Sequence, residues 1–129
     1  MDGPDVQIQN IRIRLSGIDC PEAGQPYGKN AKRFLSAYVG TVRFVGAEKD
    51  RNGRLIAEIF GEHQTESINL KLVREGLAWH YTRFSDDEAL AAAEQEARED
   101  KRELWGGSHK PIAPWDWRKL SKEERDQFR

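Results

Sequence analysis

Apolar and polar residues alternate over residues 6–15, but the alternation shifts by one position at Asn10. In residues 6–8 the even-numbered positions are apolar, and in residues 11–15 the odd-numbered positions are apolar. Such alternation is typical of a half-buried strand. The change of phase predicts either one bent strand or two short strands with a bulge between them.

The next segments change from helical to strand periodicity. Apolar residues within 31–38 recur at helical spacing, and Gly40 is expected to end that helix. Residues 41–60 predict two strands joined at Asn52 and Gly53. This pair favours a tight hairpin, because both turn residues are expected to take positive φ.

The second half of the chain is mainly helical in its pattern. Residues 68–73 predict a short helix, and residues 77–84 predict a brief strand. Ser85 and Glu88 have the spacing of a capping box, which predicts that the longest helix begins there and covers residues 86–104.

Strand, helix, hairpin, helix, strand and helix follow one another in this order. Short antiparallel strands with a helix between them indicate an α+β fold built on a small Greek-key barrel of the OB-fold type. A chain of 129 residues is long enough for one such core. We expect one domain over residues 1–110 and a C-terminal arm over residues 111–129, with Trp115 or Trp117 packed against the domain.

Charge narrows the classes of function. Charged residues make up 33% of the chain, but 21 Lys and Arg nearly cancel 22 Asp and Glu, which leaves a net charge of -1. Any site for an anion must therefore be a local cluster of basic groups. One cysteine excludes an intrachain disulfide. We expect no membrane partner, because no stretch is apolar enough to span a bilayer, and no signal peptide is visible, which leaves the compartment open.

Two arginines and two carboxylates are the candidate chemical groups. Arg14 lies near the end of a predicted strand, Asp19 and Glu22 lie in the turn after it, and Arg54 follows the predicted hairpin. Convergence of the four would suit phosphodiester hydrolysis, which needs oxygen ligands for a hard cation, a base and fork-shaped donors. Each also has a simpler interpretation as a solvated strand face, a turn with a helix start, or a charge beside a hairpin.

Five motifs in register resemble the thermonuclease family, whose members are staphylococcal nuclease-like domains. They are "RIRLSGIDCPE", "YGKNAKRFL", "KDRNGRLIAEIF", "INLKLVREGLAW" and "EAREDKRELW", and together they extend over roughly residues 6–105. The resemblance implies an OB-fold with a five-stranded barrel and three helices. It also implies a calcium-dependent enzyme, often exported, that cuts DNA and RNA to leave 3′-phosphate ends.

The resemblance also implies roles for individual residues. Arg14 would hold the scissile phosphate, and Arg54 would stabilise the transition state and the leaving oxygen. Asp19 would be a calcium ligand, with the backbone carbonyl of Cys20 beside it. Glu22 would be the general base on a water next to the calcium. The Cys20 side chain itself is expected to be a small buried filler.

For nucleic-acid binding the resemblance points to Tyr81, Phe84 and Arg51. Phe84 stands where many family members have a second tyrosine, so it can stack on a base but cannot donate a hydrogen bond to a phosphate. The tryptophans are expected to pack in the core and the arm. The histidines do not have the spacing of metal ligands.

The N-terminus departs from the family, whose members have a "D-G-D-T" motif that provides another calcium ligand. Only nine positions separate Asp5 from Arg14, which we take as too few for a strand, a hairpin and a returning strand. We therefore interpret Asp2 and Gly3 as the hairpin turn, with the first strand and one ligand missing. This predicts weak calcium binding, low nuclease activity, and an open barrel or a homodimer formed by strand exchange or edge pairing. The alternative function is a non-catalytic OB-fold domain that binds nucleic acid or protein.

Overall fold

The computed structural model describes residues 6–8, 11–37, 42–107 and 110–128. Strand β1 (Val6–Ile8) pairs antiparallel with β2 (Ile11–Leu15), and Ile8 lies opposite Ile11. Residues 6–15 therefore contain two antiparallel strands rather than one bent strand. The judgement that residues 6–15 are too few for a strand and its return was wrong, and the proposed turn at Asp2 and Gly3 lies outside the described residues.

The described strands form two sheets. Strand β5 (Leu55–Gly61) pairs parallel with β2 and antiparallel with β4 (Val42–Lys49), so the larger sheet has the order β1-β2-β5-β4. Strand β3 (Ile18–Asp19) pairs antiparallel with β6 (Trp79–His80). Helices and sheets confirm the α+β class. The described residues contain six strands in two sheets, whereas the resemblance implies five strands in one barrel. No strand pairing among the described residues closes the two sheets into a barrel.

The hairpin between β4 and β5 has a longer connection than the sequence pattern predicts. Residues 50–54 join the strands, and Gly53 takes a positive φ of 79° whereas Asn52 does not. The carboxylate of Asp50 accepts hydrogen bonds from the backbone N–H groups of Asn52 and Arg54, both at 2.9 Å. The side chain of Asp50, rather than two left-handed residues, therefore holds this loop.

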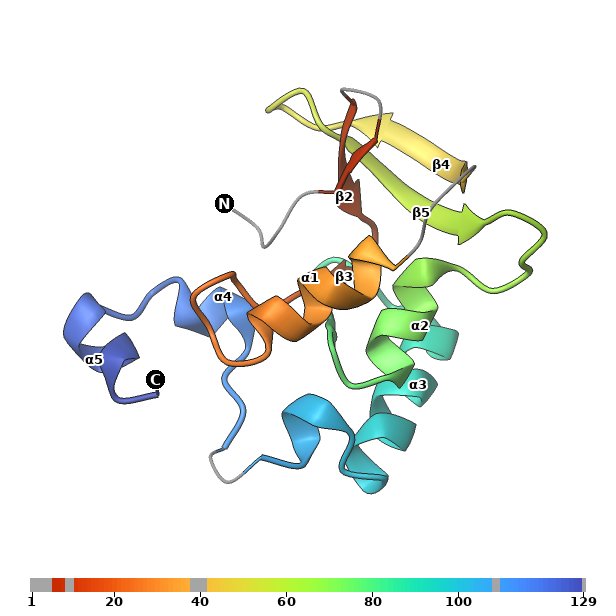
Figure 1. Ribbon diagram of the computed structural model, residues 1–129. Helices are drawn as coiled ribbons and strands as arrows, with labels where there is room; N and C mark the ends of the chain where they lie inside the picture. The colour runs from red at the N-terminus through yellow and green to blue at the C-terminus, as the bar shows by residue number, and fades with distance from the viewer. Residues whose placement is uncertain (1–5, 9–10, 38–41, 108–109, 129) are drawn as a thin grey trace.

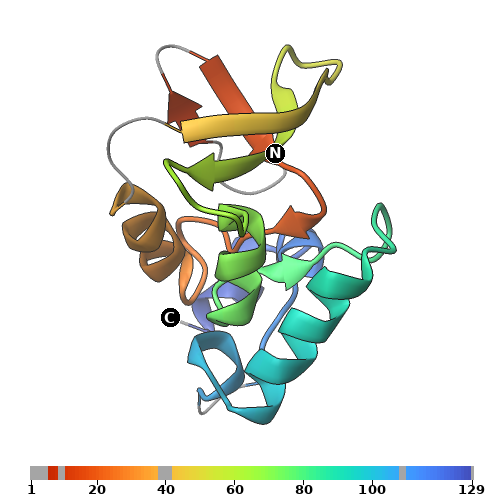
Figure 2. The ribbon, with the colours of Figure 1, turned by 90° about the vertical axis from the view of Figure 1, so that its right-hand side faces the viewer.

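Three helices lie below the larger sheet in Figures 1 and 2. They are α1 (Gly28–Ser36), α2 (Ile68–Arg74) and α3 (Glu88–Glu99). The predicted cap of α3 was wrong: Asp87 Oδ1 accepts the N–H of Leu90 at 3.0 Å, and Ser85 Oγ instead accepts the N–H of Asp87 at 3.2 Å. A carboxylate at this position satisfies a free N–H and also favours the positive end of the helix dipole.

The helix predicted over residues 86–104 ends at Glu99. Lys101 and Glu103 have φ angles of 53° and 43°, so the chain turns there into a 3-10 turn, Glu103–Trp105. The C-terminal arm adds α4 (Pro114–Trp117) and α5 (Lys122–Asp126), which the three-helix expectation did not include. No helix in the described ranges is both long and apolar enough to cross a membrane.

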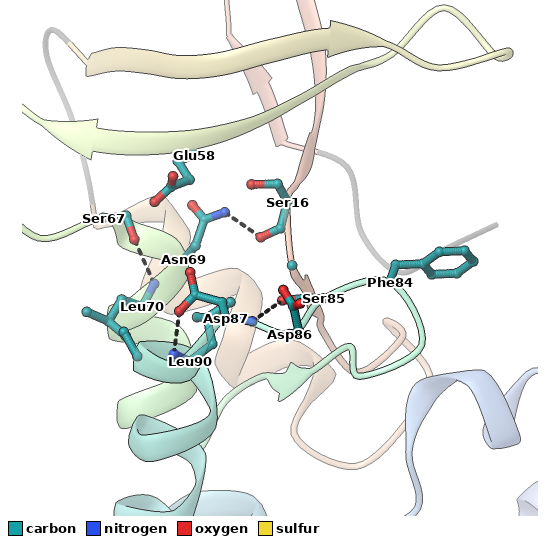
Figure 3. A pocket seen from close by; sticks show the side chains of 12 residues that line it. Ser16, Glu58, Ser67, Asn69, Leu70, Phe84, Ser85, Asp86, Asp87 and Leu90 are labelled. Carbon is teal, nitrogen blue, oxygen red and sulfur yellow. Dashed lines mark hydrogen bonds between the residues drawn. The ribbon is translucent and has the colours of Figure 1, made fainter.

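A buried amide joins the sheet to α2. Asn69 is 1% exposed, and its Nδ2 donates to the carbonyls of Ser16 (2.9 Å) and Ala57 (3.3 Å) while its Oδ1 accepts the N–H of Ile59 at 3.1 Å (Figure 3). It therefore satisfies backbone groups of β5 and of the residue after β2. Around it lies the apolar core, which includes Ile13, Leu15, Ala57, Ile59, Leu72 and Val73.

The C-terminal arm lies beside α1 in Figure 1 and is held by aromatic side chains. Trp117 is 1% exposed, and the ring of Trp115 stacks on Tyr81 with centroids 5.0 Å apart and planes 9° apart. In addition, Gln25 Nε2 donates to the carbonyl of Ile112 at 2.6 Å. The arm is thus in contact with the turn that follows β3.

Replacing the buried amide should destabilise the protein. Asn69→Ala leaves buried backbone groups of Ile59, Ser16 and Ala57 without their partner, so we expect a loss of about 3 kcal/mol in the free energy of unfolding. Urea unfolding followed by circular dichroism measures this loss. Gln95→Ala, on the exposed surface of α3, is the control and should change stability by less than about 0.5 kcal/mol. Equal stability of the two variants would contradict the role of Asn69.

Replacing the buried indole of the arm tests how firmly the arm is docked. Trp117→Ala removes a fully buried aromatic side chain and should cost about 3–5 kcal/mol. Phe84→Ala is the matched control, because Phe84 is 71% exposed and its removal leaves no cavity. Thermal unfolding should therefore separate the two variants clearly, and equal melting temperatures would show that the arm contributes nothing to stability.

Candidate active site

The strand register directs Arg14 and Arg54 to the same side of the larger sheet. Arg14 of β2 has Ile56 of β5 as its Cα partner, and Arg54 lies two residues before Ile56. Because side chains alternate along an extended chain, Arg54 shares the side of Ile56 and hence of Arg14. The guanidinium of Arg14 also lies over the ring of Tyr81, 5.4 Å from its centroid.

Arg54 is held rigidly by the loop before it. Its side chain is 5% exposed, and its Nε donates to Asp50 Oδ2 at 2.8 Å. Desolvation opposes ionisation of Asp50, but hydrogen bonds from the Arg54 backbone, the Arg54 side chain and the Asn52 backbone together lower the pKa of Asp50. A charge that merely flanks a hairpin is normally exposed, so this burial argues against the simple interpretation of Arg54.

The two candidate carboxylates lie in and just after β3. The side chain of Asp19 is fully buried, whereas that of Glu22 is partly exposed. The turn that carries Glu22 is fixed by Gln25, whose Oε1 accepts the N–H of Glu22 at 3.1 Å. Gly28 is required here, because a Cβ at this position would meet the carbonyl oxygen of Glu22 at 1.8 Å.

An arginine of the C-terminal arm joins these two carboxylates. Arg118 donates from Nη2 and Nη1 to Asp19 Oδ2, at 2.5 and 3.1 Å, and its Nε lies 3.1 Å from Glu22 Oε1. Sequence reasoning missed Arg118, which is 99 residues from Asp19 along the chain. The one available signal was "WDWRK", where an arginine directly follows an indole expected to dock.

Cys20 lies next to Asp19 but has the environment of an inert thiol. Its side chain is buried, and burial, followed by the negative charge of Asp19, raises its pKa to about 12, although Arg14 acts in the opposite direction. A thiol with so high a pKa is neutral at physiological pH and is a poor nucleophile. The side chain is thus a packing residue. Coordination of a metal by its backbone carbonyl stays a prediction.

A calcium ion does not fit the carboxylates in the arrangement described. Calcium binds about six to eight oxygens at 2.3–2.6 Å, and Arg118 occupies Asp19 Oδ2 and Glu22 Oε1. Within the described ranges, no group of three or more His, Cys, Asp and Glu could hold a metal ion. The described donors therefore do not suffice for calcium while Arg118 contacts them.

The residues expected to bind nucleic acid differ in their exposure. Phe84 is 71% exposed and its ring can accept a base, whereas Tyr81 is only 9% exposed. The ring of Tyr81 stacks on Trp115, and its centroid lies 4.9 Å from that of Phe84 in a T-shaped arrangement. Arg51 is exposed in the loop between β4 and β5. Base stacking is therefore simplest at Phe84.

A polar cavity of about 390 Å³ lies between the end of β2, β5 and the starts of α2 and α3 (Figure 3). Its lining includes Phe84 and the carboxylates of Glu58, Asp86 and Asp87, but none of the five candidate catalytic and metal residues. Three carboxylates repel a phosphate, so this cavity does not suit a phosphodiester.

Comparison with known proteins relates this geometry to a nuclease family. The family described as staphylococcal nuclease homologue matches residues 12–107. An Escherichia coli protein described as an uncharacterized endonuclease is 33% identical over 124 residues, which are 92% of this chain and 80% of that protein. A micrococcal nuclease of Shigella flexneri is 33% identical over 137 residues, covering 95% of this chain and 78% of that protein.

A plant relative is much longer than this chain. A probable staphylococcal-like nuclease of Oryza sativa subsp. japonica is 35% identical over 119 residues, which cover 91% of this chain. The match covers only 35% of the length of the plant protein. The chain thus corresponds to about a third of that relative.

The pKa of Cys20 predicts its reactivity. At pH 8 a thiol with a pKa of about 12 is almost entirely protonated, so a maleimide should label the native protein very slowly and the urea-unfolded protein rapidly. The unfolded state loses this proton more easily than the folded state, so stability should fall as pH rises from about 9 towards 12. Equal labelling rates in native buffer and in urea would contradict the burial of Cys20.

Proposed function

Because this chain belongs to the family of staphylococcal nuclease homologues, we propose that it is a nuclease domain that hydrolyses phosphodiester bonds of DNA and RNA. The observation that supports this most is the parallel register of β2 and β5, which directs Arg14 and Arg54 to one side of the sheet. Two guanidinium groups there match the fork geometry of phosphate oxygens.

In the proposed reaction a water attacks the phosphorus and the P–O5′ bond breaks, which leaves a 3′-phosphate and a 5′-hydroxyl whose oxygen takes a proton from solvent. Glu22 accepts the proton of the water, and its partial exposure leaves room for that water. Arg14 binds the scissile phosphate. Arg54 stabilises the charge that develops on the pentacovalent phosphorus and on the leaving oxygen.

The pairing of Arg54 with Asp50 suits this role. A guanidinium that is already oriented by a carboxylate loses little conformational entropy when it binds phosphate. Phe84 offers a stacking surface for a base next to the scissile bond, with Arg51 as a further cationic contact. Tyr81 acts through its contact with Arg14, because most of its ring is covered.

We propose calcium as the metal, with Asp19 and the Cys20 carbonyl among its ligands, because the family is generally calcium-dependent. Calcium also requires that Arg118 leave Asp19 and Glu22.

The two sheets are proposed to belong to an OB-type barrel. Strand β1 lies at one edge of the larger sheet, so pairing of two β1 edges is the proposed route to a homodimer.

A non-catalytic nucleic-acid-binding domain is the second candidate. One observation favours it, namely that Asp19 and Glu22 are both ion-paired with an arginine of the same chain. Carboxylates held in this way neutralise a positive charge and contribute no metal site, while Phe84 and the arginines still bind a strand. The two candidates differ in whether phosphodiester bonds are cut.

Cleavage of plasmid DNA and of a labelled RNA by the purified chain, with calcium or with EDTA, tests the proposal. Cleavage that needs calcium and falls about 10²–10³-fold in Arg14→Lys and in Arg54→Lys is expected, because lysine cannot form the forked contact. Arg43→Lys, at an exposed position of β4, is the control and should keep the full rate. Strand binding without any cleavage would favour the second candidate.

A further inference from the structure

The guanidinium of Arg118 lies between the two carboxylates that the proposed nuclease reaction uses. It takes one oxygen from each, with contacts of 2.5 and 3.1 Å to Asp19 Oδ2 and 3.1 Å to Glu22 Oε1. A planar group with N–H donors on adjacent edges fits this pair of acceptors closely. The contact is thus specific in geometry and not merely a general attraction of charges.

The surroundings hold Arg118 in this position. It directly follows Trp117, which is 1% exposed, and it caps α4 with its N–H donated to the carbonyl of Pro114 at 3.0 Å. Gln25 links the backbone N–H of Glu22 to the carbonyl of Ile112, so the arm and the catalytic turn share one hydrogen-bonded unit. Only 19% of the Arg118 side chain is exposed, so water screens the ion pairs weakly.

A divalent cation bound to Asp19 and Glu22 would share these two carboxylates with the guanidinium of Arg118. Two cations about 4 Å apart on one carboxylate repel each other, even at an effective dielectric constant of about 20. Arg118 and a bound metal therefore compete for Asp19 and Glu22. Arg118 also lies outside residues 12–107, the part of the chain that the family description matches.

We propose that Arg118 is a built-in competitor of the divalent cation, so that the C-terminal arm determines the metal affinity of the site. Arg118 offsets one of the two negative charges of Asp19 and Glu22 without metal. Metal binds only in molecules in which the guanidinium has moved away, and its apparent affinity is reduced by that fraction. This inference rests on the proposed function, because it concerns the same two carboxylates.

Calorimetric titration of calcium into the full chain tests the proposal without any cleavage assay. Arg118→Gln should bind calcium about tenfold or more tightly than the unsubstituted chain, because the competing cation is gone. Lys119→Gln is the matched control, since it makes the same charge change at an exposed neighbouring position and should leave the affinity within about twofold. Adding Asp19→Asn to Arg118→Gln should abolish the gain.

Thermal unfolding of each variant shows whether it is folded at the temperature of the titration. The proposal would be overturned if Arg118→Gln bound calcium no more tightly than the unsubstituted chain, or did not bind it at all. That result would identify Arg118 as a residue that positions the carboxylates. The proposal would also be overturned if Lys119→Gln raised the calcium affinity equally, or if the higher affinity of Arg118→Gln persisted after Asp19→Asn was added. Failure of the nuclease proposal is distinguishable, because it appears as tight calcium binding by Arg118→Gln without cleavage of DNA or RNA.

Discussion

The pairing of β2 with β5 in parallel is the constraint on which the candidate site depends, and Asn69 secures it. Parallel strands cannot be joined by a tight turn, so their register must be fixed by contacts from elsewhere. The amide of Asn69 bonds to the carbonyl of Ser16 after β2 and to Ala57 and Ile59 of β5. A slip of one residue would turn Arg14 to the opposite face, away from Arg54. A buried amide on α2 thus sets the relation between two arginines that it does not touch.

The turn after β3 depends on the C-terminal arm in a similar way. Gly28 admits the Glu22 carbonyl at close range, Gln25 joins that turn to the arm, and Trp117 anchors the arm by burial. An acidic side chain as buried as Asp19 must be compensated by a positive partner, because an isolated charge in such a place costs several kcal/mol. Arg118 supplies that compensation. The arm therefore belongs to the same electrostatic unit as the turn, although the two are far apart in sequence.

The sequence predicted local features better than long-range ones. Residues 42–61 were recognisable as two strands because Asn52 and Gly53 interrupt an apolar pattern, yet the turn geometry came from Asp50, whose side-chain bonds no spacing rule anticipates. Ser85 satisfied the spacing of a capping box, but Asp87 sits closer to the first turn and competes better for its N–H groups. The hairpin at residues 6–15 was misjudged because strands of three and five residues need far less chain than average strands. Arg118 could not be assigned to Asp19, because only the tertiary fold brings them together.

Ion pairs within the chain balance most of the charge around the candidate site, as opposite charges do in the whole chain, whose net charge is -1. Arg54 is neutralised by Asp50, and Arg118 is shared between Asp19 and Glu22, so the carboxylates beside the candidate site are held by cations of the chain itself. A phosphodiester that binds Arg14 and Arg54 adds one negative charge, and a metal on the carboxylates adds two positive ones. Together the two ligands add one positive charge, which is the charge that Arg118 removes when it leaves Asp19 and Glu22. In the proposed site, movement of Arg118 away from the carboxylates is consequently easiest when metal and phosphate bind together.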